Sequence, residues 1–539
     1  MTKSALGLFL CGVFLCSLAT IIATWWWLGA PVEMPPPPLG AGEKFQCVSY
    51  APFRRGQSPL DVTLHVDAAQ IDEDLARLAP LTDCVRTYSI DRGLDQVAGI
   101  AQRHGLKVLQ GLWLGNDAEK NRYQIETTVA LANRYPDVIS AVVVGNEVLL
   151  RGELSATDLA AIVRKVKAEV PVPVTYADVW EFWLRNRDLA AAADFITIHI
   201  LPYWEDFPIA ADRAAAHVES IRAKVAAAFP GREILIGEVG WPSAGRMREG
   251  ALPSRSNQAR VLEEVLIKAR RDNYRVNLIE AFDQPWKRQL EGTVGGHWGL
   301  IDADTREPKF IWGQPVSDHP YWRWAAGCGV ALAFLVCATA LFAHSRSKTP
   351  LTAGAAAGVA VNALIPGAIV GWAIANVPVE SLGVGGWTRS LALVAIAIAA
   401  PVLATAALVQ NVAPPSFARL LGRKRPVDLL SIALGLALLA LMLLSVQTAL
   451  GFVFDPRYRD FPFAPLTSAT VPFLVLTLCG PRGQGPRGVA EMVAATALAM
   501  SAVFMVLNES FVNWQAVWLA AIFAVCAFTL VQSRDAQSS

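Results

Sequence analysis

The sequence predicts a mixed α/β protein in which a (β/α)8 TIM barrel is joined to a multi-span α-helical membrane domain. Of its 539 residues, 53% are apolar and only 17% are charged, which is more apolar than soluble domains usually are. The apolar excess is concentrated in residues 5–28 and again after residue 324. Between these regions, eight strand-like apolar runs alternate with helix-length segments, the pattern of a barrel of ordinary size.

The N-terminal region, residues 1–30, is predicted to be a transmembrane anchor. Residues 5–28 carry no charge over 24 positions, which is enough to cross a bilayer. That stretch is longer than the apolar core of a signal peptide, so we expect an uncleaved anchor rather than a signal cleaved near "LGA" at 28–30. Residues 31–43, "PVEMPPPPLGAGE", predict a stiff proline-rich linker.

Residues 44–316 are predicted to form the barrel. Continuous apolar runs are typical of parallel strands that are covered on both faces. The predicted strands are 45–52, 84–90, 107–114, 138–147, 171–179, 194–201, 233–241 and 277–284, with helical patterns between them such as 158–170 and 257–273. The alternative, a doubly wound sheet, would usually carry a glycine-rich phosphate turn near its start, and the sequence has none.

Residues 321–535 are predicted to be a membrane domain with about seven helices. Their apolar runs lie at about 324–343, 353–376, 389–410, 429–451, 465–479, 488–507 and 511–532. If the N-terminus is cytoplasmic, ten Lys and Arg residues of the short loops lie inside: Lys3, Arg346, Lys348, Arg419, Arg423, Lys424, Arg425, Arg482, Arg487 and Arg534. Only Arg389, Arg457 and Arg459 lie outside, so we expect both termini in the cytoplasm and the barrel on the opposite side.

Composition and motifs exclude several classes of function. The net charge of +1 gives no reason to expect a nucleic-acid partner. No CxxC or HExxH spacing suggests a metal site, and we expect no cofactor. Because the apolar spans hold almost no ionisable residue, we favour a packed anchor in the lipid bilayer over a transporter. Cys47 and Cys84 lie on predicted core strands, where we expect buried thiols, although an oxidising compartment would permit a disulfide.

Two glutamates end predicted strands directly after branched apolar runs: Glu147 after "VVVGN" and Glu238 after "ILIG". In a barrel, the catalytic groups sit at the C-terminal ends of the strands. Two carboxylates that face each other across a barrel mouth suit cleavage of a glycosidic bond. The alternative is that each glutamate is a rim residue paired with a cation. A single strand-end glutamate would favour this alternative, but two in the same local context favour a catalytic pair. His199 is expected to be a hydrogen-bonded core or rim residue rather than a metal ligand.

The segments "VVVGNEVL" and "ILIGEVGWPSAG" closely resemble the two signatures of glycoside hydrolase family 17, the β-1,3-glucanases and related glucan transglycosylases. "CVSYAPFRRGQSP", "AFDQPWK" and "HWGLID" are also similar to that family, so the resemblance covers about 45–312. It implies a retaining mechanism in which Glu147 is the general acid/base, Glu238 is the nucleophile and Asn146 binds the sugar 2-hydroxyl. The other residues expected to bind substrate or adjust the nucleophile are Tyr50, Arg86, Tyr88, Tyr203, Trp241, Asp283, Gln284, Trp286 and Lys287.

The resemblance leaves hydrolysis and transfer open, because many members carry an acidic residue where this chain has Gln284. A membrane tether favours transfer, as in membrane-bound proteobacterial family 17 glucosyltransferases. We therefore expect an inner-membrane enzyme that branches, elongates or cyclises periplasmic β-1,3-glucan through a covalent glucosyl–Glu238 intermediate, beside a separate glucan synthase. The alternatives are a β-1,3-glucan hydrolase, a non-catalytic glucan-binding receptor and a transporter with a glycan-binding head.

Overall fold

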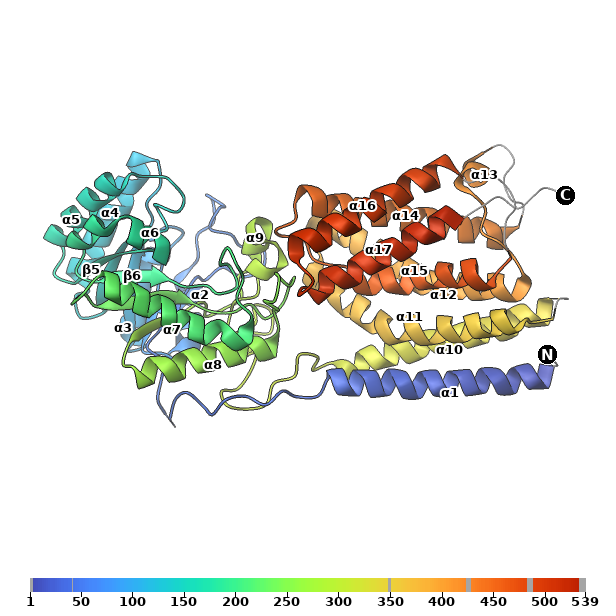
Figure 1. Cartoon of the computed structure of the whole chain (residues 1–539). Helices are drawn as coiled ribbons and strands as arrows, with labels where there is room; N and C mark the ends of the chain where they lie inside the picture. Colours follow the sequence, from blue (N-terminus) through green and yellow to red (C-terminus); the bar gives the residue numbers. More distant parts are fainter. Residues whose placement is uncertain (1–2, 41, 348–349, 423–427, 482–487, 533–539) are drawn as a thin grey trace. The chain divides into compact units, whose positions relative to one another are not determined.

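The computed structural model describes residues 3–40, 42–347, 350–422, 428–481 and 488–532. The chain divides into two compact units, Val32–Val316 and Met1–Pro31 with Ser317–Ser539, each of which is drawn in Figure 1. Several residues of the charge argument lie outside the described residues, namely Lys348, Arg423, Lys424, Arg425, Arg482, Arg487 and Arg534.

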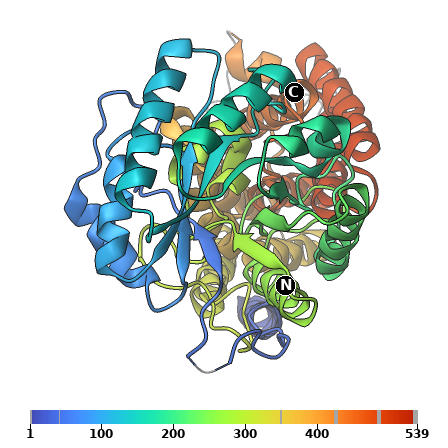
Figure 2. The ribbon, with the colours of Figure 1, turned by 90° about the vertical axis from the view of Figure 1, so that its left-hand side faces the viewer.

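The first unit contains the predicted barrel. Within residues 42–347, all of which are described, eight parallel strands close in the order β1 to β8, each paired with its neighbours in sequence and β1 with β8. Figure 2 shows the strands at the centre with the helices around them. The strands are β1 Cys47–Ser49, β2 Cys84–Arg86, β3 Lys107–Leu112, β4 Ile139–Asn146, β5 Val174–Val179, β6 Ile196–His199, β7 Ile234–Val239 and β8 Arg275–Leu278.

Amphipathic helices cover the strands from outside. They are α2 Ala68–Leu78, α3 Val97–Arg103, α4 Ala118–Arg134, α5 Ala156–Glu169, α6 Trp180–Arg185, α7 Ala211–Ala228 and α8 Arg255–Arg271, whereas α9 Arg288–Gly295 packs on the short turn Pro285–Lys287 that precedes it. Side-chain oxygens cap the first turns of four of them, from Asp67, Asp117, Ser155 and Ser254. Such caps satisfy amide groups that have no partner inside the helix, so they fix where each helix begins.

Cys47 and Cys84 form a disulfide, which corrects the expectation of free buried thiols. Val48 of β1 lies beside Val85 of β2, and this register places the two cysteines side by side with 4.3 Å between their Cα atoms. Both side chains belong to a small cluster with Leu109, Ala141 and other residues that is separate from the large core shared with the helices. The disulfide therefore cross-links the first two strands within the barrel core.

The last strand is shorter than predicted. The sequence predicts one strand over 277–284, but β8 ends at Leu278. Beyond it, the Ile279 and Ala281 amides still donate to carbonyls of the neighbouring strands β7 and β1, whereas the Glu280 and Asp283 amides donate to the Trp298 and Ile301 carbonyls of a distant segment. Asp283 and Gln284 consequently lie beyond the strand end rather than at it.

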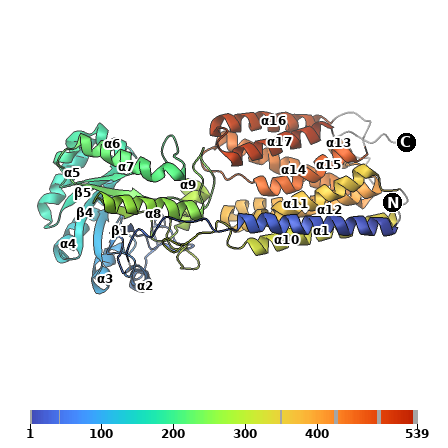
Figure 3. The same cartoon turned by 60° about the horizontal axis from the view of Figure 1, so that its bottom comes forward.

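The second unit is a bundle of apolar helices. By length and composition, seven helices among the described residues could cross a membrane: α1 Ala5–Leu28 of Lys3–Leu28, α10 Trp322–Arg346, α11 Ala353–Glu380, α12 Gly383–Gln410, α14 Leu429–Phe454, α16 Val489–Glu509 and α17 Trp514–Gln532. The apolar α15, Phe463–Cys479, is shorter, and the short α13, Phe417–Leu421, was not predicted. In Figure 3, α1 runs along α10 and α11, with which it packs.

Glycines permit close helix crossings in this bundle. A Cβ atom on Gly371 of α11 would lie 2.3 Å from the Ala325 carbonyl oxygen of α10, and one on Gly329 would lie 2.1 Å from the Gly367 carbonyl oxygen. Small residues at such crossings let helix backbones approach each other, which is the usual basis of helix association in membranes. The helices are thus packed into a defined bundle rather than being separate anchors.

Candidate active site

The guanidinium of Arg86 lies at the centre of the polar network inside the barrel mouth. Arg86 ends β2, is almost completely buried, and donates from Nη2 to Asn146 Oδ1 at 2.6 Å. Its Nη1 donates to the Gly237 carbonyl at 2.6 Å and to Glu238 Oε1 at 3.3 Å. A buried guanidinium is stable only when anions and acceptors surround it. Arg86 thus joins the ends of β2, β4 and β7.

The strand end of β4 turns Glu147 into the mouth. Gly145 has φ +85° and Glu147 has φ +54°, and the pairing register between β4 and β5 shifts just before them. A left-handed backbone is uncommon for a residue with a side chain, and such positions cluster at functional sites. The Glu147 amide still donates to the Ala177 carbonyl of β5 at 2.8 Å, so the unusual turn is held by the sheet.

Gly237 is required by close packing below Glu238. A Cβ atom on Gly237 would lie 2.4 Å from Thr197 Cγ2 and 3.3 Å from Arg86 Nη1. Any larger side chain would displace the guanidinium that contacts Glu238. The "ILIGE" segment therefore ends a buried strand with a glycine that leaves room for Arg86, followed by a carboxylate that accepts a hydrogen bond from Arg86.

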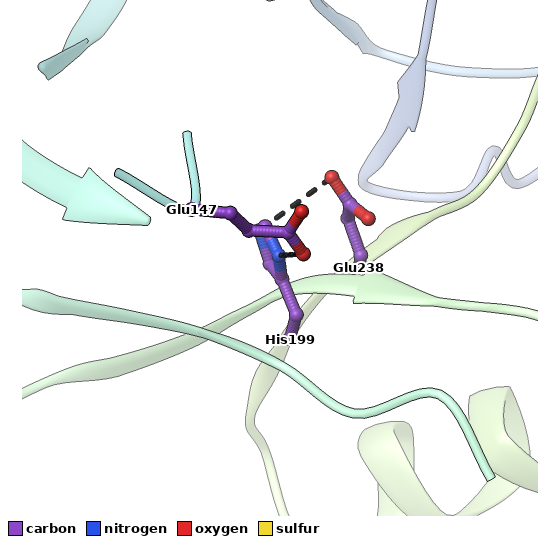
Figure 4. Close-up of side chains that lie close together, drawn as sticks. All are labelled: Glu147, His199 and Glu238. Atoms are coloured by element: carbon purple, nitrogen blue, oxygen red, sulfur yellow. Dashed lines mark hydrogen bonds and ion pairs between the residues drawn. The ribbon is translucent and has the colours of Figure 1, made fainter. Parts of the chain in front are cut away.

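Glu147 and Glu238 approach each other on two sides of His199, as Figure 4 shows. One carboxylate oxygen of each lies within 4.8 Å of the other. His199 is fully buried at the end of β6; its Nδ1 lies 2.9 Å from Glu147 Oε1 and its Nε2 lies 3.5 Å from Glu238 Oε1. Retaining glycosidases hold their two carboxyl groups about 5–5.5 Å apart, whereas inverting enzymes hold them farther apart to admit water.

A chain of hydrogen bonds supports Glu238. The Tyr88 hydroxyl lies 2.9 Å from Glu238 Oε1 and 2.7 Å from Ser49 Oγ, and Asn277 Nδ2 donates to Ser49 Oγ at 2.8 Å. A carboxylate accepts only, so the single phenolic proton of Tyr88 goes to Glu238 and the Ser49 hydroxyl donates to Tyr88. Burial and the charge of Glu238 raise the pKa of Tyr88 well above its usual value, so the phenol remains a donor.

The surroundings of Glu147 favour its ionised form. Burial raises the pKa of this carboxyl, but the hydrogen bond from His199 and the charges of Arg151 and Arg86 outweigh that effect, so its pKa lies below the usual value. A less polar setting was expected for a general acid. The structure instead gives Glu147 a donor and cations, an environment that suits a base and that stabilises the carboxylate left after proton donation.

The same three side chains could be taken for a metal site because their ligand atoms are close together. Arg86 argues against this interpretation. Its nitrogens lie 3.3 Å from His199 Nε2 and 3.3 Å from Glu238 Oε1, so a divalent cation at these atoms would meet a guanidinium. Arg86 already supplies positive charge and donors to Glu238, and we interpret the cluster as a carboxylate pair.

Lys287 lies beside an acidic pair that the sequence analysis did not single out. Its Nζ contacts Glu280 Oε1 at 3.0 Å and Oε2 at 2.9 Å. Burial raises the pKa of Glu280 to about 7, although Lys287 lowers it. Burial also raises the pKa of Glu291. The positive charge of Lys287 lowers this pKa, whereas the negative charges of Glu147 and Glu238 raise it further. Glu280 interrupts an apolar run just as Glu238 does, and this signal could have identified it.

Several predicted binding residues have their polar groups engaged in the barrel framework. The Tyr50 hydroxyl donates to Asp74 at 3.2 Å, and the Tyr203 hydroxyl donates to the Arg246 carbonyl at 2.9 Å. Trp241 is fully buried and its indole nitrogen donates to the Leu252 carbonyl, so it packs in the core rather than presenting a face to a sugar.

The strand-eight motif is likewise engaged in the framework. Asp283 accepts from Lys309 Nζ at 2.6 Å, and Gln284 Nε2 donates to the Ala51 carbonyl at 2.8 Å. Trp286 is partly exposed, and its indole nitrogen donates to Gln284 Oε1 at 2.9 Å. Of the two predicted tryptophan platforms, only Trp286 keeps an accessible surface.

Comparison with known proteins agrees with this geometry. Residues 47–299 match the family model described as the BtgE/BtgC glycoside hydrolase domain. The chain is 26% identical over 264 residues to a Candida albicans protein named glucan 1,3-beta-glucosidase, a match that covers 44% of this chain and 84% of the relative. It is 27% identical over 264 residues to a protein of the same name from Arthroderma benhamiae, covering 45% and 84%.

A solved structure of a glycoside hydrolase family 17 beta-1,3-glucanosyltransferase from Rhizomucor miehei is 26% identical, with a TM-score of 0.44, and the match covers 49% of this chain and 95% of that one. The curated relatives cover less than half of this chain, and the family model matches the barrel alone. The resemblance drawn from the two glutamate segments is confirmed: the barrel, over residues 47–299, matches a glycoside hydrolase domain, and the homologues support a glycoside hydrolase-type enzyme.

Proposed function

We propose that the barrel is a retaining enzyme acting on β-1,3-glucan, with Glu238 as the nucleophile and Glu147 as the general acid/base. The observation that carries the proposal is the pair of carboxylates within 4.8 Å of each other in the barrel mouth. The relatives named glucan 1,3-beta-glucosidases support the choice of substrate.

The proposed reaction has two steps. The Glu238 carboxylate attacks C1 of the glucan, the C1–O bond breaks, and Glu147 gives its proton to the leaving oxygen, which forms a glucosyl ester. An acceptor hydroxyl then attacks C1 while Glu147 takes its proton, and Glu238 leaves as a carboxylate. Arg86 and Tyr88, both bonded to Glu238 Oε1, stabilise the nucleophile before and after the ester exists. Water as acceptor gives hydrolysis, and a sugar hydroxyl gives transfer.

We propose transfer as the physiological reaction, with branching, elongation or cyclisation of periplasmic β-glucan as its outcome. The helical unit supports this proposal because a tethered enzyme is placed to modify glucan as it leaves a synthase in the same membrane. Hydrolysis remains the second candidate, since both reactions use the same intermediate.

We also propose that the barrel lies outside the cytoplasm, at the inner membrane. The disulfide between Cys47 and Cys84 supports an oxidising compartment. Tryptophans mark one end of the bundle: all nine in its described helices lie in the helix halves towards the end of α1 and the start of α10. They are Trp25, Trp26, Trp27, Trp322, Trp324, Trp372, Trp387, Trp514 and Trp518.

These tryptophans form contacts that connect the helix ends. Trp25 packs edge-on against Trp372, and Phe463 packs against both Trp372 and Trp514. Trp26 and Trp27 are exposed. Tryptophan is enriched at membrane–water interfaces, and basic residues mark the cytoplasmic side. The tryptophan-rich end of the bundle therefore marks one membrane–water interface, and the proposed orientation rests on the Lys and Arg residues of the short loops.

The test is product analysis with the purified full-length chain in detergent. It is incubated with linear β-1,3-gluco-oligosaccharides, and the products are resolved by mass and linkage. Glu238→Gln and Glu147→Gln serve as inactive variants, and Glu233→Gln, at an exposed carboxylate paired with Arg275, is the matched control. Products longer than the substrate establish transfer, and only shorter products establish hydrolysis. Absence of products with glucan binding retained would overturn the enzyme in favour of a receptor.

A further inference from the structure

His199 lies between the two carboxylates, although the two-carboxylate mechanism assigns it no step. Its ring is completely buried, with Nδ1 2.9 Å from Glu147 Oε1 (Figure 4). Nε2 faces Glu238 Oε1 at the longer distance of 3.5 Å. A buried imidazole that touches both the acid/base and the nucleophile is placed to influence one or both of them.

The neighbours of the ring determine which nitrogen carries its proton. Nη1 and Nη2 of Arg86 each lie 3.3 Å from His199 Nε2. A guanidinium only donates, so Nε2 must present its lone pair, and the neutral ring carries its hydrogen on Nδ1. The Nδ1–H group therefore donates to Glu147 Oε1.

The remaining charges around the ring are consistent with this tautomer. Arg86 approaches from β2, Glu147 from the end of β4 and Glu238 from β7, while Asp178 of the adjoining β5 acts through its charge. Asp178 is itself occupied, accepting from the Tyr176 hydroxyl and the Val179 amide. Arg86 thus opposes a second proton on Nε2, and the ring keeps one donor that points at Glu147.

We propose that His199 is a positioning residue that assigns the catalytic proton of Glu147 to Oε2. This inference rests on the proposed role of Glu147 as general acid/base. Because Oε1 accepts the Nδ1–H group, the single proton of the carboxyl group sits on the other oxygen. It leaves from Oε2 to the glycosidic oxygen in the first step, and the acceptor's proton returns to Oε2 in the second, while His199 keeps its own proton throughout.

The hydrogen bond from His199 also changes strength during the reaction. A bond to an ionised acceptor is about twice as strong as one to a neutral acceptor. As Glu147 loses its proton to the leaving oxygen, the His199 bond strengthens and stabilises the developing carboxylate. This stabilisation lowers the barrier only when the leaving group needs a proton from Glu147. A positioning role therefore depends on the leaving group, whereas a purely structural role does not.

The experiment compares two donors in the full-length chain. The leaving group of laminaritriose is a sugar hydroxyl that requires protonation, whereas the fluoride of β-laminaribiosyl fluoride requires little. His199→Leu removes the donor, and His199→Asn retains an N–H group close to the position of Nδ1. The control is His217→Leu on α7, since His217 contacts Glu205 at 2.9 Å and is the same residue type in the same barrel.

We expect His199→Leu to lower kcat/KM for laminaritriose about 10- to 150-fold more than for the fluoride, the range for a hydrogen bond to a charged group. His199→Asn should recover at least half of that difference on a logarithmic scale, and His217→Leu should leave the ratio between donors unchanged. Equal losses on both donors, or no recovery in His199→Asn, would overturn the inference while leaving the proposed function intact. A wild-type chain that turned over neither donor would overturn the proposed function itself.

Discussion

Removing the Tyr88 hydroxyl tests whether the hydrogen bonds to Glu238 act in catalysis. Tyr88→Phe deletes one oxygen and keeps the ring, which Arg86 approaches to 4.7 Å from its centre. Glu238 Oε1 then keeps Arg86 Nη1 at 3.3 Å and loses the closer donor at 2.9 Å. The Ser49 hydroxyl also loses its acceptor in the chain that begins at Asn277.

The two chemical steps should respond differently. The bond from Tyr88 is charge-assisted while Glu238 is a carboxylate and weaker once it is an ester. Deglucosylation regenerates the carboxylate, so it loses the most when the donor is absent. A hydrogen bond to a charged group contributes about 1.5–3 kcal/mol, which corresponds to a slowing of about 10- to 150-fold in that step.

The assay follows turnover of β-laminaribiosyl fluoride and, after acid quenching, the mass of the intact protein. We expect a lower kcat in Tyr88→Phe together with a larger fraction of protein carrying the glycosyl adduct. The matched control is Tyr50→Phe, whose hydroxyl donates to Asp74 at 3.2 Å outside the carboxylate pair, and it should keep kcat within about twofold. A kcat for Tyr88→Phe within twofold of wild type, with no added adduct, would refute the reasoning.

Three further predictions concern the framework. Cys84→Ser should lower the free energy of unfolding of the barrel by about 2–5 kcal/mol, measured by chemical denaturation, and reducing agent should lower the wild-type value to the same level. Gly371→Leu should destabilise the bundle in detergent because its Cβ would meet the Ala325 backbone, whereas Gly327→Leu, with open space around the Cβ, should not; equal melting temperatures would contradict this. Lys287→Met should destabilise the barrel more at pH 8 than at pH 5, measured by thermal melting. Because the pKa of Glu280 is raised to about 7, the protonated Glu280 stabilises the fold below about pH 4.5, and this stabilisation is lost as pH rises through 7. Without the Lys287 cation beside it, the ionised Glu280 destabilises the fold more at high pH. An equal effect of Lys287→Met at both pH values would contradict this prediction.

The barrel was predictable because its strands are unbroken apolar runs of the type that parallel sheets require. The runs at β4 and β7 end where branched residues give way to glycine and an acid, and the structure places the strand ends there. The error at β8 has a physical cause. Residues 279–284 are buried, but the amides of Glu280 and Asp283 donate to the Trp298 and Ile301 carbonyls, which are long-range contacts that no local pattern reveals.

The site was predictable where the fold alone decides the position. Arg86, Asn146 and Glu238 end strands or lie one residue from an end, and a closed parallel barrel brings such ends together. Trp241 lies beyond a strand end, where only tertiary packing decides which way a side chain points, and it faces the core. The disulfide escaped prediction for a similar reason, since it depends on the register of β1 against β2.

The glutamine at position 284 does not argue against efficient hydrolysis, although the resemblance raised that question. Its amide nitrogen donates to the Ala51 carbonyl and its oxygen accepts from Trp286, so it braces the strand-eight loop rather than facing the nucleophile. The charged groups that act on Glu238 electrostatically include Glu291 and Lys287 instead. In the proposed mechanism, Arg86, Tyr88 and His199 act on the glucosyl–Glu238 ester in the same way whichever acceptor attacks, so the choice between water and sugar would be made by surfaces that bind the acceptor. Substitutions at Gln284 should therefore alter the stability of the barrel more than the ratio of transfer to hydrolysis.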